Sequence, residues 1–221
     1  MRVLAFDTSL GGGSVALTEA GSCLARANED RPRALVERLL PMIEGVLRQA
    51  GVRYVDLDLI ATTVGPGTFA GLRIGVAVAR GLGVATGVRT AGVTSLEALA
   101  QGALAEAAPG ATIVAAIDGR RGQLYLQPFR AGPVLESLSA PRAVDVEELP
   151  AMLPKTGLAV GSGAAIAAAA APGLAVLSGH DRIDAVHVAA IAASLPPSSL
   201  PPRPLYLRPP DAKLPGGHPA A

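Results

Sequence analysis

The chain has 221 residues, half of them hydrophobic, and its 19 lysines and arginines are almost balanced by 18 aspartates and glutamates. This composition can bury one large core or two small lobes, and it supplies no excess of positive charge with which the chain could hold a polyanion unaided. The single cysteine, Cys23, excludes an internal disulfide framework and any thiolate zinc site within one chain.

A three-strand meander is predicted at the start of the chain. Residues 3–6 are apolar and end at Asp7, and the glycines 11–13 separate them from a second apolar stretch at 15–17. A third strand is expected at 23–27, after a turn. The remaining elements of the first half are predicted as a helix at 34–50, a buried strand at 59–64, a helix at 68–86, and a helix that Thr94 and Glu97 begin with a capping box.

The second half repeats the beginning of the first. Residues 114–117 form an apolar stretch that ends at Asp118, a turn follows at 119–122, and 123–129 return, with a further strand expected at 134–138. The same motif in both halves predicts a duplicated α/β protein with parallel strand pairs and two related lobes, because solenoid repeats are much shorter. The other elements predicted in this half are a short helix begun by Asp145 and Glu148, a strand at 158–160 and an alanine-rich helix at 166–171.

We expect an N-terminal lobe at 1–100, a C-terminal lobe at 101–195 and a proline-rich C-terminal arm at 196–221. The prolines predict an extended arm with a frayed end, which only residues 205–208 interrupt. No uninterrupted apolar run reaches the roughly 18 residues that a membrane span needs, and no charged leader precedes a signal-type core. A cytoplasmic protein that does not enter a membrane is therefore expected.

A glycine-rich turn leaves the buried strand and enters the helix at 68–86. Within that helix Gly71, Gly75, Ala79 and Gly83 recur at intervals of four, so they line one helical face. Each glycine costs a helix about 1 kcal/mol relative to alanine, and the usual compensation is another backbone packed very close to the stripe. The sequence leaves open whether that backbone is internal or belongs to another protein.

Two neighbouring helices are predicted to carry a docking surface. The helix at 34–50 is apolar over more of its circumference than one core contact requires. On the helix at 68–86, Arg73 and Arg80 share one side with apolar residues, a mixture that is typical of interfaces. The alternative is that both helices are enclosed by their own domain. The predicted partner interface comprises Leu35, Leu39, Met42, Ile43, Val46, Phe69, Leu72, Arg73, Val76 and Arg80.

The glycine-rich turn also offers an enzymatic alternative. Gly65, Gly67 and Ala70 spell a version of the dinucleotide-binding fingerprint after a strand and before a helix. Against it, no acidic residue lies some twenty residues further on, where a ribose contact is expected, and Arg89 would at most suit a phosphorylated cofactor. A Walker-type phosphate loop is excluded because no lysine follows Gly71.

A second enzymatic alternative is an ATP-dependent phosphotransferase of the sugar-kinase type. Asp7 and Asp118 both end strands beside glycine turns, where such a duplicated enzyme could hold a metal-bound nucleotide. However, aspartate is also a common turn former, and two arginines follow Gly119 where a phosphate hairpin prefers small residues. A structural use is therefore favoured. The positions of the degenerate nucleotide site are Asp7, Thr8, Asp118, Gly119 and Arg120.

No metal site and no catalytic centre are predicted. His180, Asp181, Asp184 and His187 cluster in the sequence and would be the ligands of a metal ion. Asp184 is more simply the N-cap of the apolar helix that follows, and one helical face cannot present both histidines with good geometry. No serine, histidine and aspartate set with an elbow motif occurs, and Cys23 on a strand is expected to be packed.

Several segments of the chain resemble the TsaB (YeaZ) family. They are LAFDTS at 4–9, LLPMI at 39–43, the glycine-rich turn at 65–75, AAIDGR at 115–120 and PLYLR at 204–208. The resemblance spans nearly the whole chain, and the turn is its most specific part, although Thr68 and Ala70 depart from the commoner Ser-Phe-Thr-Gly form. It implies the fold of actin, sugar kinases and heat-shock ATPases (ASKHA), built from two ribonuclease-H-like lobes.

The resemblance also implies a role. TsaB proteins dock on and stimulate a catalytic subunit, TsaD, which with the ATPase TsaE transfers a threonylcarbamoyl group from its adenylate to N6 of adenosine 37 in tRNAs that read ANN codons. In the catalytic relative two histidines on the first long helix bind the metal, and residues 35–40 contain none, which supports a non-catalytic subunit without a cofactor of its own. ATP, metal and threonylcarbamoyl-adenylate are then expected at the partner subunits. The resemblance further implies that tRNA is bound only through the complex, and that the chain alone forms a homodimer through its first two long helices.

Overall fold

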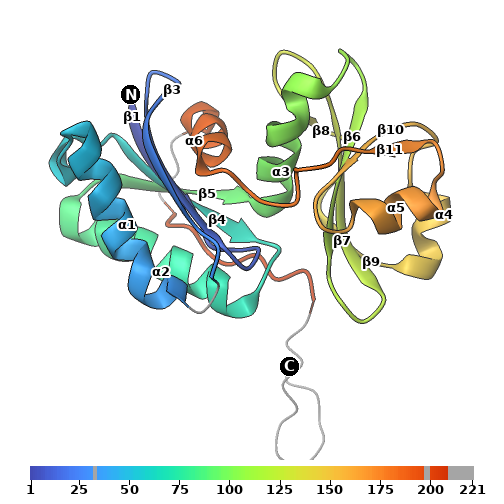
Figure 1. Ribbon diagram of the computed structural model, residues 1–221, viewed down its shortest axis with the longest axis horizontal. Helices are drawn as coiled ribbons and strands as arrows, with labels where there is room; N and C mark the ends of the chain where they lie inside the picture. The colour runs from blue at the N-terminus through green and yellow to red at the C-terminus, as the bar shows by residue number, and fades with distance from the viewer. Residues whose placement is uncertain (32–33, 197–199, 209–221) are drawn as a thin grey trace, which may run out of the picture.

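Two β-sheets and three layers of helices alternate through the molecule (Figure 1). The computed structural model describes residues 1–31, 34–196 and 200–208. A pair of helices covers the outer side of each sheet, and a third pair, α3 (Ser95–Ala103) and α6 (Ala185–Ser194), lies between the sheets. The chain therefore has two sheet-centred lobes joined through shared inner helices.

The first sheet has the strand order β3-β2-β1-β4-β5. Its central strand, β1, pairs antiparallel with β2 and parallel with β4. Helices α1 and α2 cover its outer face (Figure 1). The elements are β1 (Arg2–Asp7), β2 (Gly13–Glu19), β3 (Ser22–Glu29), α1 (Leu35–Ala50), β4 (Leu59–Gly65), α2 (Phe69–Thr86) and β5 (Arg89–Thr94).

The second sheet has the order β11-β10-β6-β7-β8, and β9 also pairs with β7. β6 pairs antiparallel with β7 and parallel with β10, as β1 does with β2 and β4. The predicted duplication is confirmed, with the two outer helices shortened. The elements are β6 (Thr112–Asp118), β7 (Gln123–Arg130), β8 (Glu136–Ser137), β9 (Arg142–Asp145), α4 (Leu149–Met152), β10 (Gly157–Val160), α5 (Ala164–Ala170) and β11 (Leu174–Val176).

Side chains of β1 alternate between two hydrophobic cores. Leu4 and Phe6 are buried among residues of α1 and α2, whereas Val3 and Ala5 are buried among residues of α3 and α6. Successive residues of a strand point to opposite faces, so a strand that helices cover on both faces has to be apolar throughout. This double coverage explains the continuous apolar runs from which the central strands are predicted.

The last helix of the second half packs on the first sheet. α6 contacts β1 and β2, and the backbone N–H of Ala185 donates to Ser14 Oγ at 2.9 Å. Asp184 caps the helix by accepting a hydrogen bond from the backbone N–H of Val186, as predicted. The segment predicted as the C-terminal lobe, 101–195, thus contributes its last helix to the packing of the N-terminal lobe.

Local signals place some of the helix ends. α3 begins with the predicted capping box, in which the Thr94 hydroxyl accepts from the backbone N–H of Glu97 and the Glu97 carboxylate accepts from that of Thr94. α1 and α2 both end at a glycine with positive φ, Gly51 and Gly87. The helix predicted from Asp145 begins instead with a turn of 3-10 helix that the Asp145 side chain does not cap.

The strand predicted at 134–138 is much shorter in the structure. Only Glu136 and Ser137, which form β8, pair with β7 in this stretch. Most of the strand that pairs with the free edge of β7 is supplied by β9. Val134 is 75% exposed, so the predicted stretch lacks the burial that would extend it as a strand.

Helix α2 is long and apolar enough to cross a membrane, judged by length and composition alone. It packs against β4 and β5 with Leu72, Val76 and Ala79 buried, and Arg73 and Arg80 are exposed on its other side. Helices that pack on a sheet pass the same test, so this finding by itself gives little support to a membrane span.

Candidate functional site

The glycine-rich turn is tied to the start of the β1–β2 hairpin. The backbone N–H of Thr68 donates to Ser9 O at 2.8 Å, and the Thr8 hydroxyl donates to Gly71 O at 2.7 Å. Gly65, at the end of β4, has a φ of 118°, a conformation that favours glycine. The turn therefore joins the first strand to the first residues of α2.

The glycine stripe of α2 is pressed against strands of the same chain. A Cβ at Gly71 would collide with the carbonyl oxygen of Thr8, and one at Gly75 would lie 2.5 Å from Thr8 Oγ1. A Cβ at Gly83 would lie 2.6 Å from Thr90 Cγ2. Of the two alternatives left open by the sequence, internal packing therefore explains the stripe.

Protein backbone occupies the space beside the glycines of the dinucleotide fingerprint. A Cβ at Gly67 would lie 2.5 Å from Ser9 O, and one at Gly65 would lie 2.7 Å from Leu205 O. In a dinucleotide site these glycines allow the backbone to approach the pyrophosphate. Here the close approach serves contacts within the chain, which argues against the dinucleotide-binding alternative.

Asp7 is buried at the end of β1, with 3% of its surface exposed. Its Oδ1 accepts hydrogen bonds from the backbone N–H of Ser9 at 3.0 Å and from the hydroxyls of Ser9 and Thr63, each at 2.6 Å. Ser95 extends the network, because its hydroxyl donates to Ser9 Oγ at 2.9 Å. Burial raises the pKa of Asp7, although the hydrogen bonds oppose the shift. Asp7 thereby connects β1, β4 and α3.

This burial predicts a pH dependence of stability. Because folding raises the pKa of Asp7 above its ordinary value of 3.8, the contribution of Asp7 to stability is fully present below that value and is lost as the pH rises through the folded-state pKa. The unfolding free energy of the wild type is therefore expected to fall relative to that of Asp7→Asn as the pH rises from about 4. Urea unfolding of both proteins over a pH series measures the difference, and a constant or rising difference would contradict the assignment.

Asp118, at the end of β6, forms hydrogen bonds that stabilise the β6–β7 turn. Its Oδ1 accepts from the backbone N–H of Arg120 at 2.8 Å, and its own N–H donates to Ser162 Oγ at 3.1 Å. Arg120 and Arg121 both have positive φ, 61° and 55°. The N–H of Gly119 donates to Gln123 O at 2.9 Å and closes the turn. These contacts are those of a turn-forming aspartate.

The C-terminal arm connects the two lobes. The backbone N–H of Leu205 donates to Val64 O at 2.7 Å in the first lobe. In the second lobe the guanidinium of Arg208 donates to Gln123 Oε1 at 2.9 Å and to Gly119 O at 3.2 Å. The arm thus runs from the end of β4 to the β6–β7 turn, where the guanidinium of Arg208 is hydrogen-bonded to the turn.

Removing the Arg208 guanidinium is expected to lower the unfolding free energy. Arg208→Ala should cost about 1.5–3 kcal/mol, the usual worth of hydrogen bonds from a charged group. Arg203→Ala is the matched control, because Arg203 is exposed in the same arm and has no hydrogen bond to a described residue; it should stay within about 0.5 kcal/mol of wild type. Urea unfolding measures both, and equal effects would refute the connecting role of Arg208.

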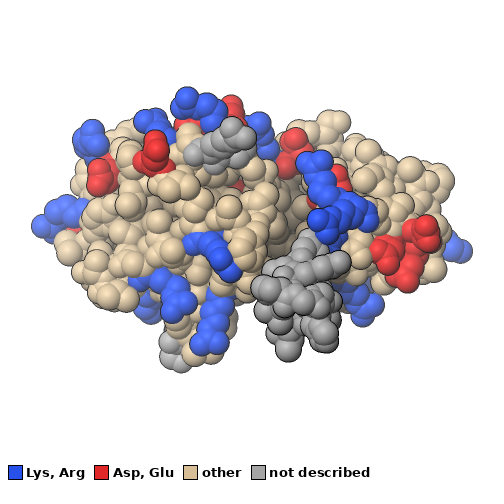
Figure 2. Space-filling view, turned by 90° about the horizontal axis from the view of Figure 1, so that it is seen from below, with Lys and Arg blue, Asp and Glu red and all other residues tan. Residues whose placement is uncertain are grey.

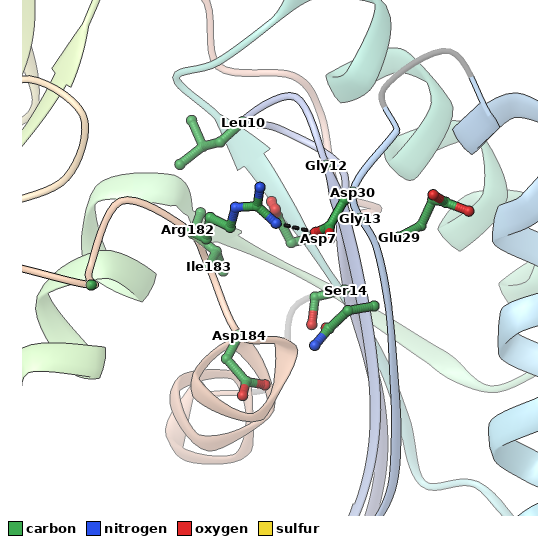
Figure 3. A pocket seen from close by; sticks show the side chains of 12 residues that line it. Asp7, Leu10, Gly12, Gly13, Ser14, Glu29, Asp30, Arg182, Ile183 and Asp184 are labelled. Carbon is green, nitrogen blue, oxygen red and sulfur yellow. Dashed lines mark hydrogen bonds and ion pairs between the residues drawn. The ribbon is translucent and has the colours of Figure 1, made fainter.

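A hollow of about 210 Å³ opens beside Asp7 (Figure 3). The β1–β2 turn and β3 line one side, and the segment before α6 lines the other. Arg182 reaches across the hollow and pairs with Asp30. Glu29 and Asp184 also line it. Arg31 and Arg38 pair with Glu29, and Arg26 pairs with Asp184. The acidic side chains are therefore largely compensated, and these guanidinium groups are already engaged and not free for the phosphates of a nucleotide.

The residues of the histidine and aspartate cluster make separate contacts. His180 Nε2 lies 2.7 Å from Glu106 Oε1, burial lowers the pKa of His187, and Asp184 caps α6. Among the residues for which the structure gives positions, no three histidine, cysteine or carboxylate side chains converge in a way that could hold a metal ion.

Comparison with known proteins places this architecture in a family. The sequence model of the family described as "TsaD: tRNA N6-adenosine threonylcarbamoyltransferase" matches residues 29–159. The TsaB protein of Escherichia coli, a tRNA threonylcarbamoyladenosine biosynthesis protein, is 40% identical over 131 residues, which cover 59% of this chain and 55% of that protein. A solved structure of an uncharacterized Pseudomonas aeruginosa protein with similarity to peptidase YEAZ has a TM-score of 0.79 at 28% identity, covering 94% of this chain and 99% of that one.

The chain belongs to the TsaB (YeaZ) family. The match spans about half the length of the curated TsaB relatives, 55% and 52%. The wider fold is confirmed by a polyphosphate/ATP-glucomannokinase of Arthrobacter, which has a TM-score of 0.53 at 10% identity over 87% of this chain and 98% of that one. That likeness shows the ASKHA fold alone.

In this TsaB-family chain, most residues predicted for the partner interface are buried in its own core. Seven of them are at most 7% exposed: Leu35, Leu39, Met42, Ile43, Val46, Leu72 and Val76. The prediction that a partner can reach these side chains is wrong, because α1 and α2 use them to cover the outer face of the first sheet. Phe69, at 52%, and Arg73 and Arg80 remain exposed.

The outer sides of α1 and α2 carry other apolar residues that the predicted interface omits. Val36 is 71% exposed and Leu40 is 46% exposed on α1. On α2, the guanidinium carbon of Arg73 lies 3.7 Å from the centre of the Phe69 ring, and the ring of Tyr206 lies 5.5 Å from it. We call Val36, Leu40, Phe69, Arg73 and Tyr206 the outer-helix face. Only its α2 part, Phe69 and Arg73, is in the predicted set.

Proposed function

We propose that the chain is a non-catalytic partner subunit for N6-threonylcarbamoylation of adenosine 37 in tRNAs that read ANN codons. In this role it docks on a TsaD-like catalytic subunit and stimulates it, together with a TsaE-like ATPase. The observation that carries the proposal is the outer-helix face, since Phe69 and Arg73 form an exposed aromatic and guanidinium pair on α2 and the neighbouring helix α1 exposes Val36 and Leu40. Aromatic residues and arginine are the residue types most enriched at the centres of protein interfaces.

The environment of the two aspartates supports a non-catalytic role. In the first lobe Asp7 is committed to internal hydrogen bonds and is buried. In the second lobe Arg208 donates hydrogen bonds to the backbone carbonyls of Gly119 and Arg120, the two residues that follow Asp118. A sugar-kinase-type phosphotransferase needs such positions for nucleotide phosphates and their metal. We therefore propose that ATP, metal and threonylcarbamoyl-adenylate bind at the partner subunits, and that the complex works in the cytoplasm.

Reconstitution of tRNA modification tests this proposal against the phosphotransferase alternative. Modification by the TsaD-like and TsaE-like partners is expected to require the chain, and Asp7→Asn and Asp118→Asn should retain at least about half of the wild-type rate, because neither carboxylate is proposed to touch substrate. Thermal unfolding in the same buffers separates loss of fold from loss of function. Full activity of the partners without the chain, or a loss of more than about 100-fold in both folded aspartate variants, would refute the proposal.

The same outer-helix face is proposed to pair two copies of the chain when no partner is present. Covering the exposed apolar residues of α1 and α2 removes them from water, whether the covering protein is a TsaD-like subunit or a second copy of the chain. Light scattering of the isolated chain, with and without an equimolar TsaD-like subunit, is expected to show a homodimer replaced by a heterodimer.

A further inference from the structure

Three arginines surround two adjoining hollows near the C-terminal end of α2. Arg80 and Arg89 line a hollow of about 360 Å³, and Arg89 and Arg203 line one of about 250 Å³. The hollows share Thr90 and Leu200 as well as Arg89. Arg80, Arg89 and Arg203 are called the arginine site. On α2, Arg80 follows Arg73 of the outer-helix face by seven residues, roughly 10 Å along the helix.

The arginine site carries positive charge that no described residue compensates. Neither hollow has an aspartate or glutamate in its lining, and none of the three arginines forms an ion pair with a residue of the described ranges. Arg53, by contrast, pairs with Asp56 at 2.8 Å. At the lower left edge of the molecule in Figure 2, several basic side chains lie without acidic side chains beside them, whereas acidic and basic side chains lie close together on the right.

Regular structure holds the arginine site in place. Arg80 lies on α2 next to the buried Ala79, and Arg89 is the first residue of β5, where it pairs in register with Leu59 of β4. Beside Arg203, Pro202 is buried, and it packs against Gly92 of β5. Because the backbone at all three positions is already ordered, a ligand has only the arginine side chains left to order on binding.

We propose that the arginine site binds phosphate groups of the tRNA backbone. A guanidinium presents paired N–H donors that match two phosphate oxygens, and three of them around adjoining hollows suit successive phosphates of a polymer better than one small anion. The overall charge of the chain is balanced, so positive charge can attract phosphates only where arginines gather locally, as they do here. This inference rests on the proposed function in taking tRNA as the ligand, and it adds a direct contact where the family resemblance implies binding only through the complex.

The test compares the reconstituted complex containing wild-type chain with one containing the triple variant R80Q/R89Q/R203Q. Fluorescence anisotropy measures the Kd for an unmodified tRNA transcript that reads an ANN codon, over a series of salt concentrations. The triple variant is expected to raise the Kd at least about 10-fold at low salt and to reduce the slope of log Kd against log salt by about 2 to 3, since three phosphate contacts are lost.

The matched control removes three exposed arginines from other surfaces, R48Q/R130Q/R142Q, and so lowers the net charge equally. It should leave the Kd within about twofold of wild type. Equal weakening by the two triple variants, or no weakening by the first, overturns the arginine site. Loss of assembly by R80Q/R89Q/R203Q in gel filtration assigns these arginines to a protein interface and also overturns it. Equal loss of affinity for a DNA duplex of matched length overturns the assignment to RNA.

Modification activity, measured in the same samples, separates this inference from the proposed function. If the wild-type complex is active and the triple variant binds tRNA as tightly as the wild type does, only the proposed role of the arginine site is overturned. An inactive wild-type complex whose tRNA binding still depends on the three arginines overturns only the proposed function.

Discussion

Phe69→Glu is expected to abolish stable association with a TsaD-like catalytic subunit. The Phe69 ring is 52% exposed and lies against Arg73 and Tyr206, so it is already held in one orientation before a partner arrives. Aromatic residues of this kind contribute 2 kcal/mol or more at interface centres. Burying an unpaired carboxylate in place of the ring adds a further penalty. An increase in Kd of at least about 100-fold, roughly 2.7 kcal/mol, is expected.

Isothermal titration calorimetry with the purified partner measures this change. Val134→Glu provides the control, because Val134 is 75% exposed on the second lobe and is not part of the outer-helix face. The control should bind as the wild type does, and both variants should unfold within about 3 °C of wild type because neither side chain is in the core. Wild-type affinity in Phe69→Glu, or equal loss in Val134→Glu, would show that the partner docks elsewhere.

Gly71→Ala is expected to destabilise the chain strongly although it adds one methyl group. The new Cβ would collide with the carbonyl oxygen of Thr8, which is backbone and cannot rotate away as a side chain can. The hydroxyl of Thr8 also donates to Gly71 O, so the two segments are held together where they would have to separate. Overpacking of this kind costs about 1–3 kcal/mol, and it outweighs the roughly 1 kcal/mol that alanine gains over glycine in a helix.

The same helix offers a matched comparison in Gly81→Ala. A Cβ at Gly81 meets no other atom within 4 Å, so only the gain in helix propensity, about 0.5–1 kcal/mol, should remain. Thermal unfolding is expected to place Gly71→Ala below wild type and Gly81→Ala slightly above it, at about 2–4 °C per kcal/mol for a chain of this size. The same melting temperature for the two variants would mean that the glycine stripe does not require close packing.

The elements that can be predicted from the sequence are those with two buried faces or a local end signal. β1 is a continuous apolar run, and β4 is buried along almost its whole length although it contains Thr62 and Thr63, because helices cover both faces of these strands. β5 and β11, which form sheet edges, are not predicted, whereas the edge strand β3 is predicted because a turn signal precedes it. The sequence of β5, RTAGVT, is only partly buried and mixes polar with apolar residues, so it shows neither an alternating nor a continuous apolar pattern.

The candidate site is predicted less well, because its contacts are not local. Leu39 and Leu40 are adjacent and equally apolar in sequence, yet one is 1% and the other 46% exposed. A helix that is apolar on two sides does not reveal which side meets its own sheet. The contact between Arg208 and Gln123 joins residues 85 positions apart, and nothing in the sequence near either residue indicates the other.

Helix α6 has a consequence for synthesis on the ribosome. The inner face of the first sheet, including Val3 and Ala5, is covered by α6, which is translated long after the strands of that sheet. A nascent chain that ends before Ala185 therefore exposes the apolar inner face of the first sheet to chaperones and proteases. We expect the first lobe to complete its core only after residues 185–194 have been translated, however early its first strands pair.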